Sequence, residues 1–549
     1  MTPRRLETEV LVVGAGPVGL TLAMDLAWRG VAVTILEQRR RGEPPSPKCN
    51  HVAARSMEVF RRLGVAAALR EAGLPADYPH DVAYRTTTTG IELARIPIPC
   101  RRDRFTATGG PDTGWPTPEP PHRINQIYLE PILFDHLAAM PGVRILDRTR
   151  LLDVQQQEGR VLARAEGVAD GAPVEIECAW LIGCDGGRSA IRRGIGAAFR
   201  GDAVVQRVQS SFIRAPGLIP RLQAPPAWGT FSLNPRRCGN VYAIDGRELW
   251  LVHNYLQPGE EDVETVDRDA CLRAILGVGG DFDYALLNRE DWIGRRLVAE
   301  RFRDRRVFLC GDAAHIWVPK AGYGMNAGIA DAENLAWLLA GVLRGWAAPA
   351  ILAAYEAERL PITEQVSHFA MNHSNAVARQ RGAVPPEIED PGPEGTAARA
   401  RVGQAAYELN VAQYCCSGLN FGYFYDRSPI VAHDGEAPPA YGMDRFTPST
   451  VPGCRTPYLV LRDGQPLHDV LGPGFTLLRR DPALDVSPLL AAAARCGLPL
   501  ALLDLDAEAA PALYPQRLVL SRPDRHVAWR GDALPADPLA LVDLVRGAA

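Results

Sequence analysis

The sequence has no long hydrophobic run, no strongly basic segment and no Cys-x-x-Cys pair. No apolar run approaches the ~20 residues that a membrane-spanning helix needs. The formal net charge is −4, and without a basic tail or helix the chain has little attraction for nucleic-acid phosphates or anionic lipids. We therefore expect a cytoplasmic protein that binds neither nucleic acid nor membrane.

The eleven cysteines are scattered along the chain. They form no Cys-x-x-Cys motif and have no metal-ligand spacing, so we expect reduced thiols and no metal site. The chain is long, because 549 residues exceed what one hydrophobic core can organise, and this predicts two or three domains. The 51 glycines and 46 prolines indicate many turns in a globular chain.

The N-terminal segment has the pattern of a dinucleotide site. A β-branched run, Glu9–Val13, leads into Gly14-Ala15-Gly16-Pro17-Val18-Gly19, followed by apolar residues at helical spacing. In such a strand, turn and helix, the first glycine permits the turn, the second leaves room for a pyrophosphate, and the third lets helix and strand pack closely. A second strand, 31–36, ends at Glu37, where a carboxylate can accept hydrogen bonds from ribose hydroxyls.

Two later segments also read as strands that deliver polar residues. Trp180-Leu-Ile-Gly-Cys-Asp-Gly-Gly-Arg-Ser-Ala-Ile-Arg192 carries Asp185 and Gly186, and Arg306-Val-Phe-Leu-Cys-Gly-Asp-Ala-Ala-His315 carries Asp312. Gly322-Tyr-Gly-Met-Asn-Ala-Gly328 then opens a long amphipathic helix. Ligands of open α/β sheets bind at the carboxyl ends of strands, so we expect these segments near the glycine motif.

With all three motifs in family order, roughly residues 8–365 resemble the single-component flavoprotein aromatic hydroxylases. This family includes para-hydroxybenzoate hydroxylase, phenol hydroxylase and the hydroxylases of aromatic polyketide pathways. The resemblance implies that the first motif holds the ADP half of FAD, that Asp312 binds the ribityl chain, and that Asp185 and Gly186 serve both FAD and the nicotinamide cofactor. Segment 55–64 looks like the helix after the phosphate-contacting loop, and Gln126 looks like the flavin-contacting glutamine.

The cofactor-binding residues that the resemblance implies are Gly14, Gly16, Pro17, Val18, Gly19, Glu37, Gln38, Lys48, Arg55, Gln126, Asp185, Gly186, Asp312, Pro319, Gly324, Met325 and Asn326. Two departures stand out. Relatives usually carry Pro-Arg-Ala where this chain has Pro47-Lys48-Cys49, so an ammonium replaces a bidentate guanidinium. Many relatives have two glycines where this chain has Ala321 and Gly322.

The implied reaction is hydroxylation of an aromatic substrate, phenolic or polycyclic and polyketide-like. NADH or NADPH reduces FAD, O2 adds to flavin C4a, and the hydroperoxide delivers one oxygen to the ring. The sequence names no catalytic side chain, and the candidates around the isoalloxazine are Pro319, Gly322, Gly324, Met325 and Asn326. The helix that begins near Met325 and Asn326 presents free N–H groups and partial positive charge to the N1–C2=O region of reduced flavin.

Substrate contacts are less well marked. Alternation at 208–213 and 249–255 predicts antiparallel strands over the flavin, and six aromatic residues could line a pocket, although aromatics in a sheet are more often core: Trp228, Phe231, Tyr242, Trp250, His253 and Tyr255. For His315 we favour a hydrogen bond with the backbone over a role as base. Lys320 and Tyr323 face either the substrate or solvent.

Segment 355–414 reads as mainly helical with a proline-rich break at 384–394, and apolar runs at 457–462, 474–479, 498–503 and 517–522 read as strands. The ending 518–531 resembles the tail hairpin of the thioredoxin-like domain of phenol hydroxylase. Without Cys-x-x-Cys we expect a structural or subunit-contact role for it, and we consider a homodimer.

The expected fold class is α/β, with a Rossmann-like FAD-binding domain, an inserted antiparallel-sheet substrate domain and a thioredoxin-like C-terminal domain. The FAD-binding domain is expected at residues 1–75, 121–199 and 299–365, and the substrate-binding domain at 76–120 and 200–298. A helical linker at 366–429 and the thioredoxin-like domain at 430–549 follow.

Two alternatives stay open. The first is an FAD-dependent oxidoreductase of the same superfamily with another outcome: reduction, halogenation or oxidative decarboxylation. The absence of a Trp-x-Trp-x-Ile-Pro element disfavours halogenation. The second is a binding protein that keeps the cofactor site without turnover.

Overall fold

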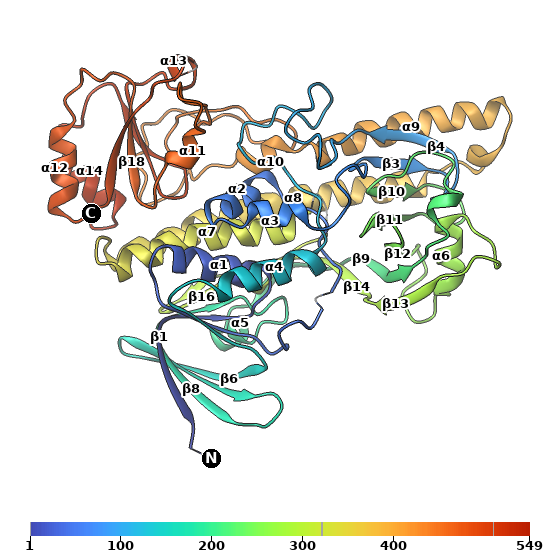
Figure 1. Ribbon diagram of the computed structural model, residues 1–549, viewed down its shortest axis with the longest axis horizontal. Helices are drawn as coiled ribbons and strands as arrows, with labels where there is room; N and C mark the ends of the chain where they lie inside the picture. The colour runs from blue at the N-terminus through green and yellow to red at the C-terminus, as the bar shows by residue number, and fades with distance from the viewer. Residues whose placement is uncertain (1, 45, 320–321, 509) are drawn as a thin grey trace.

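The computed structural model describes residues 2–44, 46–319, 322–508 and 510–549. Its first sheet, at the bottom of Figure 1, has a parallel centre in which β1 lies between β2 and β8, and β16 lies beyond β8. The strands of this sheet are β15 (Arg303–Asp304), β16 (Val307–Leu309), β8 (Pro173–Gly183), β1 (Arg4–Val13), β2 (Val33–Leu36) and β5 (Val143–Leu146), with β7 (Arg160–Gly167) and β6 (Thr149–Gln157) attached to β8. The end of β1, Val10–Val13, is fully buried because apolar layers cover both faces.

Helices α1 (Pro17–Trp28), α4 (Gln126–Ala138) and α7 (Tyr323–Leu343) lie above this sheet in Figure 1. The helix α2 (Ala54–Arg62), which the sequence predicted after the phosphate loop, packs on α7. The short α3 (Ala66–Glu71) packs against α2 and α4. Helix α7 is buried along nearly its whole length. Helices α1, α2 and α8 (Ala353–Gly382) all pack against it.

The second sheet lies at the right of Figure 1 and faces the ends of α4 and α7. Its strands in order are β17 (His315–Ile316), β14 (Trp292–Ala299), β9 (Phe199–Arg214), β12 (Leu249–Tyr255), β11 (Gly239–Ala243), β10 (Gly229–Ser232), β3 (Val82–Arg85) and β4 (Glu92–Ile96), with β13 (Ala285–Arg289) beside β9. The predicted strands at 208–213 and 249–255 pair antiparallel, with Val208 opposite Tyr255. The pairs of this sheet are antiparallel, as expected, except that β3 and β10 pair in parallel.

Two long helices, α8 (Ala353–Gly382) and α9 (Pro393–Tyr414), connect the parts of the molecule, and the proline-rich break separates them as predicted. Helix α6 (Arg268–Leu276) covers the second sheet, and α5 (Ala190–Gly194) and α10 (Ser417–Phe421) are single turns or little more. Figure 1 shows α9 lying beside β4, which it contacts.

The C-terminal part, red in Figure 1, contains a mixed sheet in the order β19 (Leu500–Asp504), β18 (Phe475–Arg479), β20 (Leu518–Ser521) and β21 (Val527–Gly531). Its helices are α11 (Leu467–Val470), α12 (Ser487–Arg495), α13 (Ala510–Leu513) and α14 (Pro538–Val545). The predicted tail hairpin is formed by β20 and β21. The strand expected at 457–462 is absent from the described residues, which show only an isolated bridge between Val460 and Pro466, because Pro457 and Pro466 remove backbone donors there.

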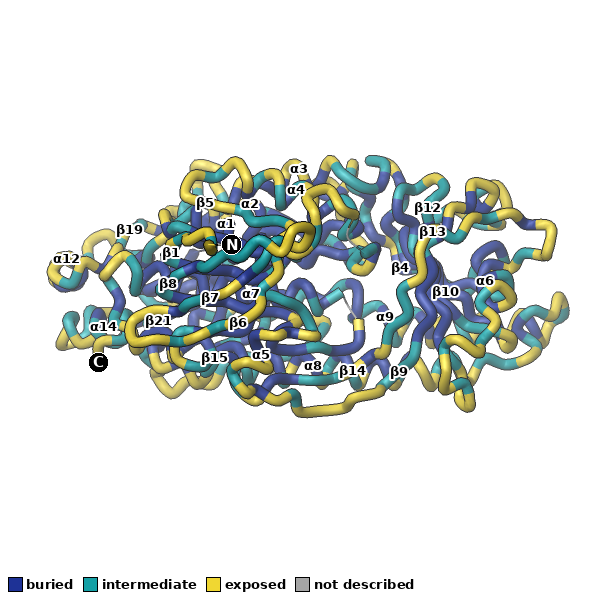
Figure 2. Tube along the Cα trace, turned by 90° about the horizontal axis from the view of Figure 1, so that it is seen from below, coloured by how far each residue is buried: buried dark blue, intermediate teal, exposed yellow. Residues whose placement is uncertain are grey.

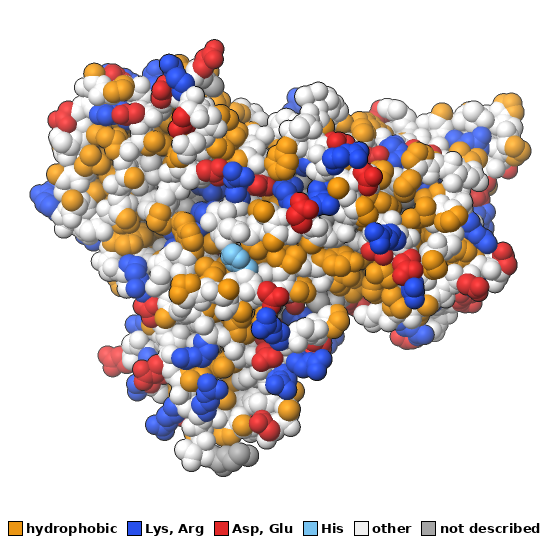
Figure 3. Space-filling model, in the orientation of Figure 1, with side chains coloured by type: hydrophobic (Ala, Val, Ile, Leu, Met, Phe, Trp, Pro, Cys, Tyr) orange, Lys and Arg blue, Asp and Glu red, His pale blue; other side chains and the backbone are white. Residues whose placement is uncertain are grey.

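The C-terminal part shares a core with the first sheet. Trp337 of α7 contacts Phe475 of β18 edge to face at 5.9 Å, and buried residues of β18 and β20 belong to the same apolar cluster as β1 and α1. Figure 2 shows buried chain around α7 and again around β10. On the face in Figure 3, acidic and basic side chains are interspersed rather than separated into patches of one sign. No helix among the described residues has the length and apolarity to cross a bilayer.

Candidate functional site

The three sequence motifs end at one edge of the first sheet. Val13 of β1 is opposite Gly183 of β8, and Gly183 is opposite Leu309 of β16, all in parallel register. The residues that follow these strands, including Gly14, Asp185 and Asp312, must therefore leave the sheet side by side. Segments nearly 300 positions apart in the chain are brought together by this register.

The glycines of the first loop meet three different surroundings. Gly14 has φ 105°, and a Cβ on it would lie 2.4 Å from the carbonyl oxygen of Cys184. A Cβ on Gly19 would lie 2.0 Å from the carbonyl oxygen of Gly14, whereas a Cβ on Gly16 would meet no atom within 4 Å. Gly14 and Gly19 are thus required by the chain itself, and the space beside Gly16 is open for a ligand. Pro17 occupies the first turn of α1, and Val18 packs on Gly311 and Gly328 near the third motif.

Glu37 ends the second strand and joins the loop to its neighbours. Its carboxylate accepts a hydrogen bond from the Ala15 N–H at 2.8 Å and one from the Arg39 N–H at 2.9 Å. The Arg39 guanidinium also pairs with Glu130 of α4 at 2.6 Å. The same guanidinium donates weakly to both Glu37 oxygens, at 3.3 and 3.4 Å. A carboxylate has about four acceptor positions, so a ribose hydroxyl would take the place of one of these long Arg39 bonds.

A cavity of about 380 Å³ opens at this edge. It is lined by Val13, Gly14, Gly16, Leu36, Glu37, Gln38, Arg39, Thr149, Arg150, Leu151, Cys184, Asp185, Arg188 and Ala190. The first and second motifs and the end of β2 therefore form one site. Its size and mixed lining suit a nucleotide half.

The two carboxylate oxygens of Asp185 have different surroundings. One carboxylate oxygen accepts hydrogen bonds from the Ala190 and Ile191 N–H groups at the start of α5, at 2.7 and 3.2 Å. The other oxygen, Oδ1, is buried and has no partner among the described residues. A Cβ on neighbouring Gly186 would meet open space. A buried acceptor without a donor is costly, so Oδ1 marks a position where a ligand hydroxyl fits.

Asp312 follows β16 and is exposed. Even so, the surrounding protein desolvates the carboxyl and raises its pKa above the usual range, while His315 and Lys48 act in the opposite direction. Lys48 itself is largely exposed, and its ammonium lies 2.5 Å from Glu290. The ammonium expected at the phosphates is therefore paired with a carboxylate next to the second sheet in this structure.

The loop before α7 brings backbone to the same region. Helix α7 begins at Tyr323 rather than near Met325, and Gly322 at its N-cap has φ 63°. A Cβ on Gly322 would lie 2.9 Å from the His51 ring, whereas a Cβ on Gly324 would meet nothing within 4 Å. Pro319 is exposed and Met325 is buried. Lys320 and Ala321, which the sequence also singled out, lie outside the described residues.

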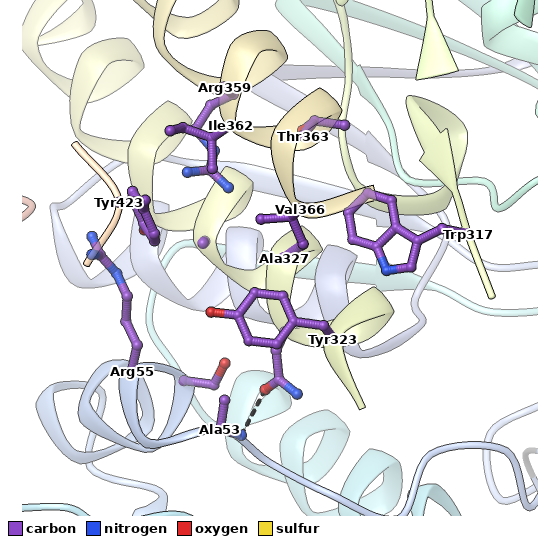
Figure 4. A pocket seen from close by; sticks show the side chains of 13 residues that line it. Ala53, Arg55, Trp317, Tyr323, Ala327, Arg359, Ile362, Thr363, Val366 and Tyr423 are labelled. Atoms are coloured by element: carbon purple, nitrogen blue, oxygen red, sulfur yellow. Dashed lines mark hydrogen bonds between the residues drawn. The ribbon is translucent and has the colours of Figure 1, made fainter. Parts of the chain in front are cut away.

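The side-chain amide of Asn326 is hydrogen-bonded to the backbone of the protein. Its side-chain oxygen accepts from the Ala53 N–H at 2.9 Å, the dashed line in Figure 4, and its amide donates to the carbonyls of His51 and Gly322 at 3.1 and 2.6 Å. The side chain thus holds the 51–53 loop against the start of α7. A contact of Asn326 with the flavin stays a prediction.

Arg55 and Gln126 have partners within the protein, and their contacts with the cofactor stay predictions. Arg55 points toward Tyr423 in Figure 4, with its guanidinium carbon 4.6 Å from the ring centroid, and it donates to the Asp524 carbonyl at 3.4 Å. It is buried against the C-terminal part. Gln126 opens α4 and donates to Glu130 at 3.0 Å. The small closed cavity in Figure 4, about 10 Å³, lies between α2, α7 and α8.

His315 differs from the interpretation given above. Its Nε2 lies 2.6 Å from the Asp331 carboxylate rather than from a backbone group, and its ring stacks on Trp317 at 4.7 Å. Arg359 donates to the same carboxylate at 2.8 Å. The Asp331 carboxyl is buried, which raises its pKa, but His315 and Arg359 outweigh this and hold the pKa below the usual range. His315 thus belongs to a structural ion cluster.

Tyr323 faces neither solvent nor the second sheet. Its hydroxyl donates to the Leu419 carbonyl of α10, and the ring is buried among residues of α8 and α10. Of the two orientations considered for Tyr323, the solvent-facing one is wrong.

Strand alternation sorts the candidate aromatics onto two faces of the second sheet. Phe231 is opposite Asn240, which is opposite His253, and Tyr255 lies two residues further along the face of His253. Tyr242 contacts His253 and Phe231 at 5.6 and 6.2 Å between ring centroids. Trp250 is displaced from His253 by an odd number of residues, so it lies on the opposite face, toward α6. The aromatic face is defined here as Phe231, Tyr242, His253 and Tyr255.

Three residues beside the aromatic face were not indicated by the sequence. Tyr414 at the end of α9 contacts Trp228 and Phe231 at 6.2 and 6.3 Å. Arg123, in the loop before α4, lies 4.4 Å from the Trp228 ring centroid, and Arg381 of α8 lies 3.8 Å from that of Tyr255. Each is a single residue in an unremarkable segment, and only the tertiary fold brings it to the sheet.

These features fit FAD. The open space at Gly16, Gly186 and Gly324 would be filled by any side chain, and the unpaired Asp185 Oδ1 supplies an acceptor. The cavity at Glu37 accommodates the adenosine half, and the N-terminus of α7 supplies free N–H groups. The described residues therefore offer hydrogen-bond donors at the start of α7, an acceptor at Asp185, and space for the cofactor at the glycines.

Comparisons with known proteins agree. The family model described as FAD binding domain matches residues 7–370. The chain is 31% identical to the FAD-dependent monooxygenase apdD of Emericella nidulans, over 96% of this chain and 88% of that protein. It is 32% identical to aklavinone 12-hydroxylase RdmE of Streptomyces purpurascens, over 97% and 96%.

Among solved structures, RebC soaked with chromopyrrolic acid and holding bound 7-carboxy-K252c matches over the whole of both chains, with 36% identity and a TM-score of 0.90. This agreement confirms the mixed α/β fold class. The chain belongs to the FAD binding domain family, within the group that contains aromatic and polyketide hydroxylases.

Proposed function

We propose that this chain is an FAD-dependent monooxygenase that uses NADH or NADPH and O2 to hydroxylate an aromatic substrate, phenolic or polycyclic and polyketide-like. The observation that carries the proposal is the register of β1, β8 and β16. It gathers the glycine loop, Asp185 and Asp312 at one edge, between the nucleotide cavity and the second sheet. Relatives named as hydroxylases of phenol and of aklavinone support the reaction class.

The residues have separable roles in this proposal. Glu37 and the loop at Gly16 bind the adenosine and pyrophosphate, Asp185 and Asp312 accept hydrogen bonds from hydroxyl groups of the cofactor, and the N-terminus of α7 stabilises negative charge. The redox chemistry comes from FAD when it is bound: it passes electrons from the nicotinamide to O2 and activates oxygen for transfer to a ring. The aromatic face excludes water and orients the substrate ring.

The test is carried out on the purified, FAD-loaded protein. Oxidation of NADH and of NADPH is measured with and without a panel of phenols and polycyclic phenols, under 18O2. We expect at least one aromatic compound to stimulate oxidation and to gain one 18O atom in the product. Stimulated oxidation without label in any product would contradict hydroxylation.

A second outcome is favoured by the likeness to RebC, a rebeccamycin biosynthetic enzyme that was solved with reduced flavin. Its identity to this chain, 35%, exceeds the 28% of the solved aklavinone-11 hydroxylase. An oxidation with another product, such as oxidative decarboxylation, is therefore the second candidate. Mass spectrometry of the same reactions separates the two, because hydroxylation adds one oxygen whereas decarboxylation releases CO2.

A further inference from the structure

Arg123 is a buried cation without a carboxylate partner. It is 3% exposed, and among the described residues its hydrogen bonding is confined to the Nδ1 atom of His51. His51 cannot neutralise it, because an imidazole is either neutral or positively charged. Burial and the neighbouring guanidinium groups hold the pKa of His51 well below its usual range, so His51 is a neutral acceptor. A buried guanidinium that lacks an anion is strongly unfavourable.

The carboxylate near Arg123, that of Asp112, already has other hydrogen-bond partners. Asp112 is 1% exposed, and its carboxylate is bonded to Arg104 at 2.5 Å and to the Trp115 indole N–H at 3.0 Å. Two buried guanidinium groups, Arg104 and Arg123, therefore share one buried carboxylate. One positive charge is left over on the side of Arg123.

A second cation lies at the other end of the aromatic face. The guanidinium carbon of Arg381 is 3.8 Å from the Tyr255 ring centroid, and both Nη atoms are buried without a hydrogen-bond acceptor. In the part of the chain that the structure describes, neither Arg123 nor Arg381 takes part in an ion pair. The Tyr255 hydroxyl interacts with this guanidinium, which lowers the pKa of the hydroxyl against the effect of burial, but no carboxylate pairs with Arg381 among the described residues.

The position of Arg123 links it to both halves of the site. Its partner His51 contacts Gly322 at the start of α7, on the cofactor side. Its guanidinium stacks over Trp228 at 4.4 Å and faces Tyr414 at 5.8 Å, beside the aromatic face. A planar cation next to aromatic rings is suited to hold a carboxylate while a ring of the same molecule stacks on its neighbours.

We propose that Arg123, assisted by Arg381, is a specificity residue that binds a carboxylate of the substrate, so that the enzyme acts on polycyclic aromatic acids rather than on neutral aromatics. This inference rests on the proposed function, because it places the substrate at the aromatic face. The carboxylate supplies the counter-charge that the described residues lack. Neutral analogues leave the guanidinium groups unpaired and bind weakly.

The experiment uses binding alone, without nicotinamide or turnover. Oxidised FAD-loaded protein is titrated with 1-hydroxy-2-naphthoic acid and with its methyl ester, which keeps the phenol and removes the charge, and binding is followed by flavin absorbance. We expect the acid to bind at least about tenfold more tightly than the ester. We expect Arg123→Met to abolish most of this ratio and Arg381→Met to reduce it.

Two variants serve as controls. Arg379→Met changes an exposed arginine on the same helix as Arg381 and should leave the ratio unchanged, and Arg123→Lys should keep part of it. FAD content checks that each variant is folded. Equal affinities of the wild-type protein for acid and ester, binding of neither compound, or an unchanged ratio in Arg123→Met would overturn the proposal. Because no oxygen transfer is measured, failure of hydroxylation in the 18O2 assay remains a separate result.

Discussion

Gly16 and Gly19 differ in what a side chain would meet, and this separates ligand binding from folding. At Gly16 the backbone is extended and a Cβ would enter open space. At Gly19 a Cβ would overlap the Gly14 carbonyl oxygen. The first position is therefore constrained by the ligand, and the second by close packing of α1 on the loop.

We predict that Gly16→Val weakens FAD binding by about 2–3 kcal/mol, roughly 30- to 150-fold, through loss of pyrophosphate hydrogen bonds, with little change in the melting temperature of the apoprotein. Gly19→Ala should instead destabilise the apoprotein by about 1–3 kcal/mol. FAD titration and thermal melting of both apoproteins check this. The reverse pattern, a destabilised Gly16→Val with normal FAD affinity, would contradict the assignment of the loop.

Asp312 gives a second prediction at this scale. Its carboxylate lies at the end of β16 and has no hydrogen bond to another described side chain, so we expect it to accept one from a ribityl hydroxyl. Such a charge-assisted bond contributes ~1.5–3 kcal/mol. Asp312→Ala should therefore raise the dissociation constant of FAD roughly 10- to 150-fold in a fluorescence titration. Asp283→Ala, at an exposed carboxylate away from the edge, is the control, and equal affinities of the two variants would refute the role.

Individual residues show where sequence reasoning reaches its limit. Gly16 and Asp185 could be singled out because their motifs are local: strand, turn and helix follow one another within twenty positions. The protein partners of Arg55 could not be predicted, because Tyr423 and Asp524 come from the far end of the chain. Arg123 carried no local signal, and charged residues are expected at the surface.

At the scale of elements, ion pairs connect the C-terminal hairpin to the helices around α7. Arg522, at the end of β20, donates to both oxygens of Glu358 of α8 at 2.6 and 2.8 Å and to Asp524 at 2.7 Å. All three side chains are buried. Glu58 of α2 is likewise bonded to Arg455 at 2.6 Å. These contacts fix the C-terminal part against α2 and α8.

We predict that Arg522→Met lowers the free energy of unfolding by about 3–5 kcal/mol, because Glu358 and Asp524 would stay buried without a cation. Arg462→Met, which removes an exposed pair with Asp506, should cost less than about 1 kcal/mol. Urea denaturation of both variants tests the difference. Similar midpoints for Arg522→Met and the wild-type protein would show that the cluster adds nothing to stability.

The same elements show how far periodicity goes. Alternation predicted β9 and β12 because one face of each is packed, and the long amphipathic pattern predicted α7. It could not tell which face meets the cofactor side, so Trp250 was grouped with Tyr242 although they lie on opposite faces. The parallel pairing of β3 with β10 joins segments about 150 residues apart, and a local pattern carries no information about such a partner.

At the scale of the whole molecule, buried histidines couple stability to pH. Burial lowers the pKa of five of them, with cationic neighbours contributing: His51 and His80 well below the usual value, His122 to about 3, His468 to about 4 and His526 to about 3. The folded protein therefore holds them neutral at pH values where the unfolded chain would protonate them. Buried carboxylates such as Glu58 and Asp524 have lowered pKa values and add a further loss of stability only below about pH 4.5.

We predict that stability is greatest between about pH 7 and pH 8 and falls steadily as the pH decreases below 6.5, the pKa of histidine in the unfolded chain. The sign follows from linkage, because the unfolded state binds more protons in this range, and each such histidine contributes up to about 1.4 kcal/mol per pH unit. Urea midpoints of the FAD-loaded protein at pH 7, 6 and 5 should show a loss of at least about 2 kcal/mol between pH 6 and 5. His122→Gln should reduce the slope by one proton, whereas His368→Gln, at an exposed site, should not. Equal stability at pH 7 and pH 5 would mean that these histidines titrate alike in the folded and unfolded chain.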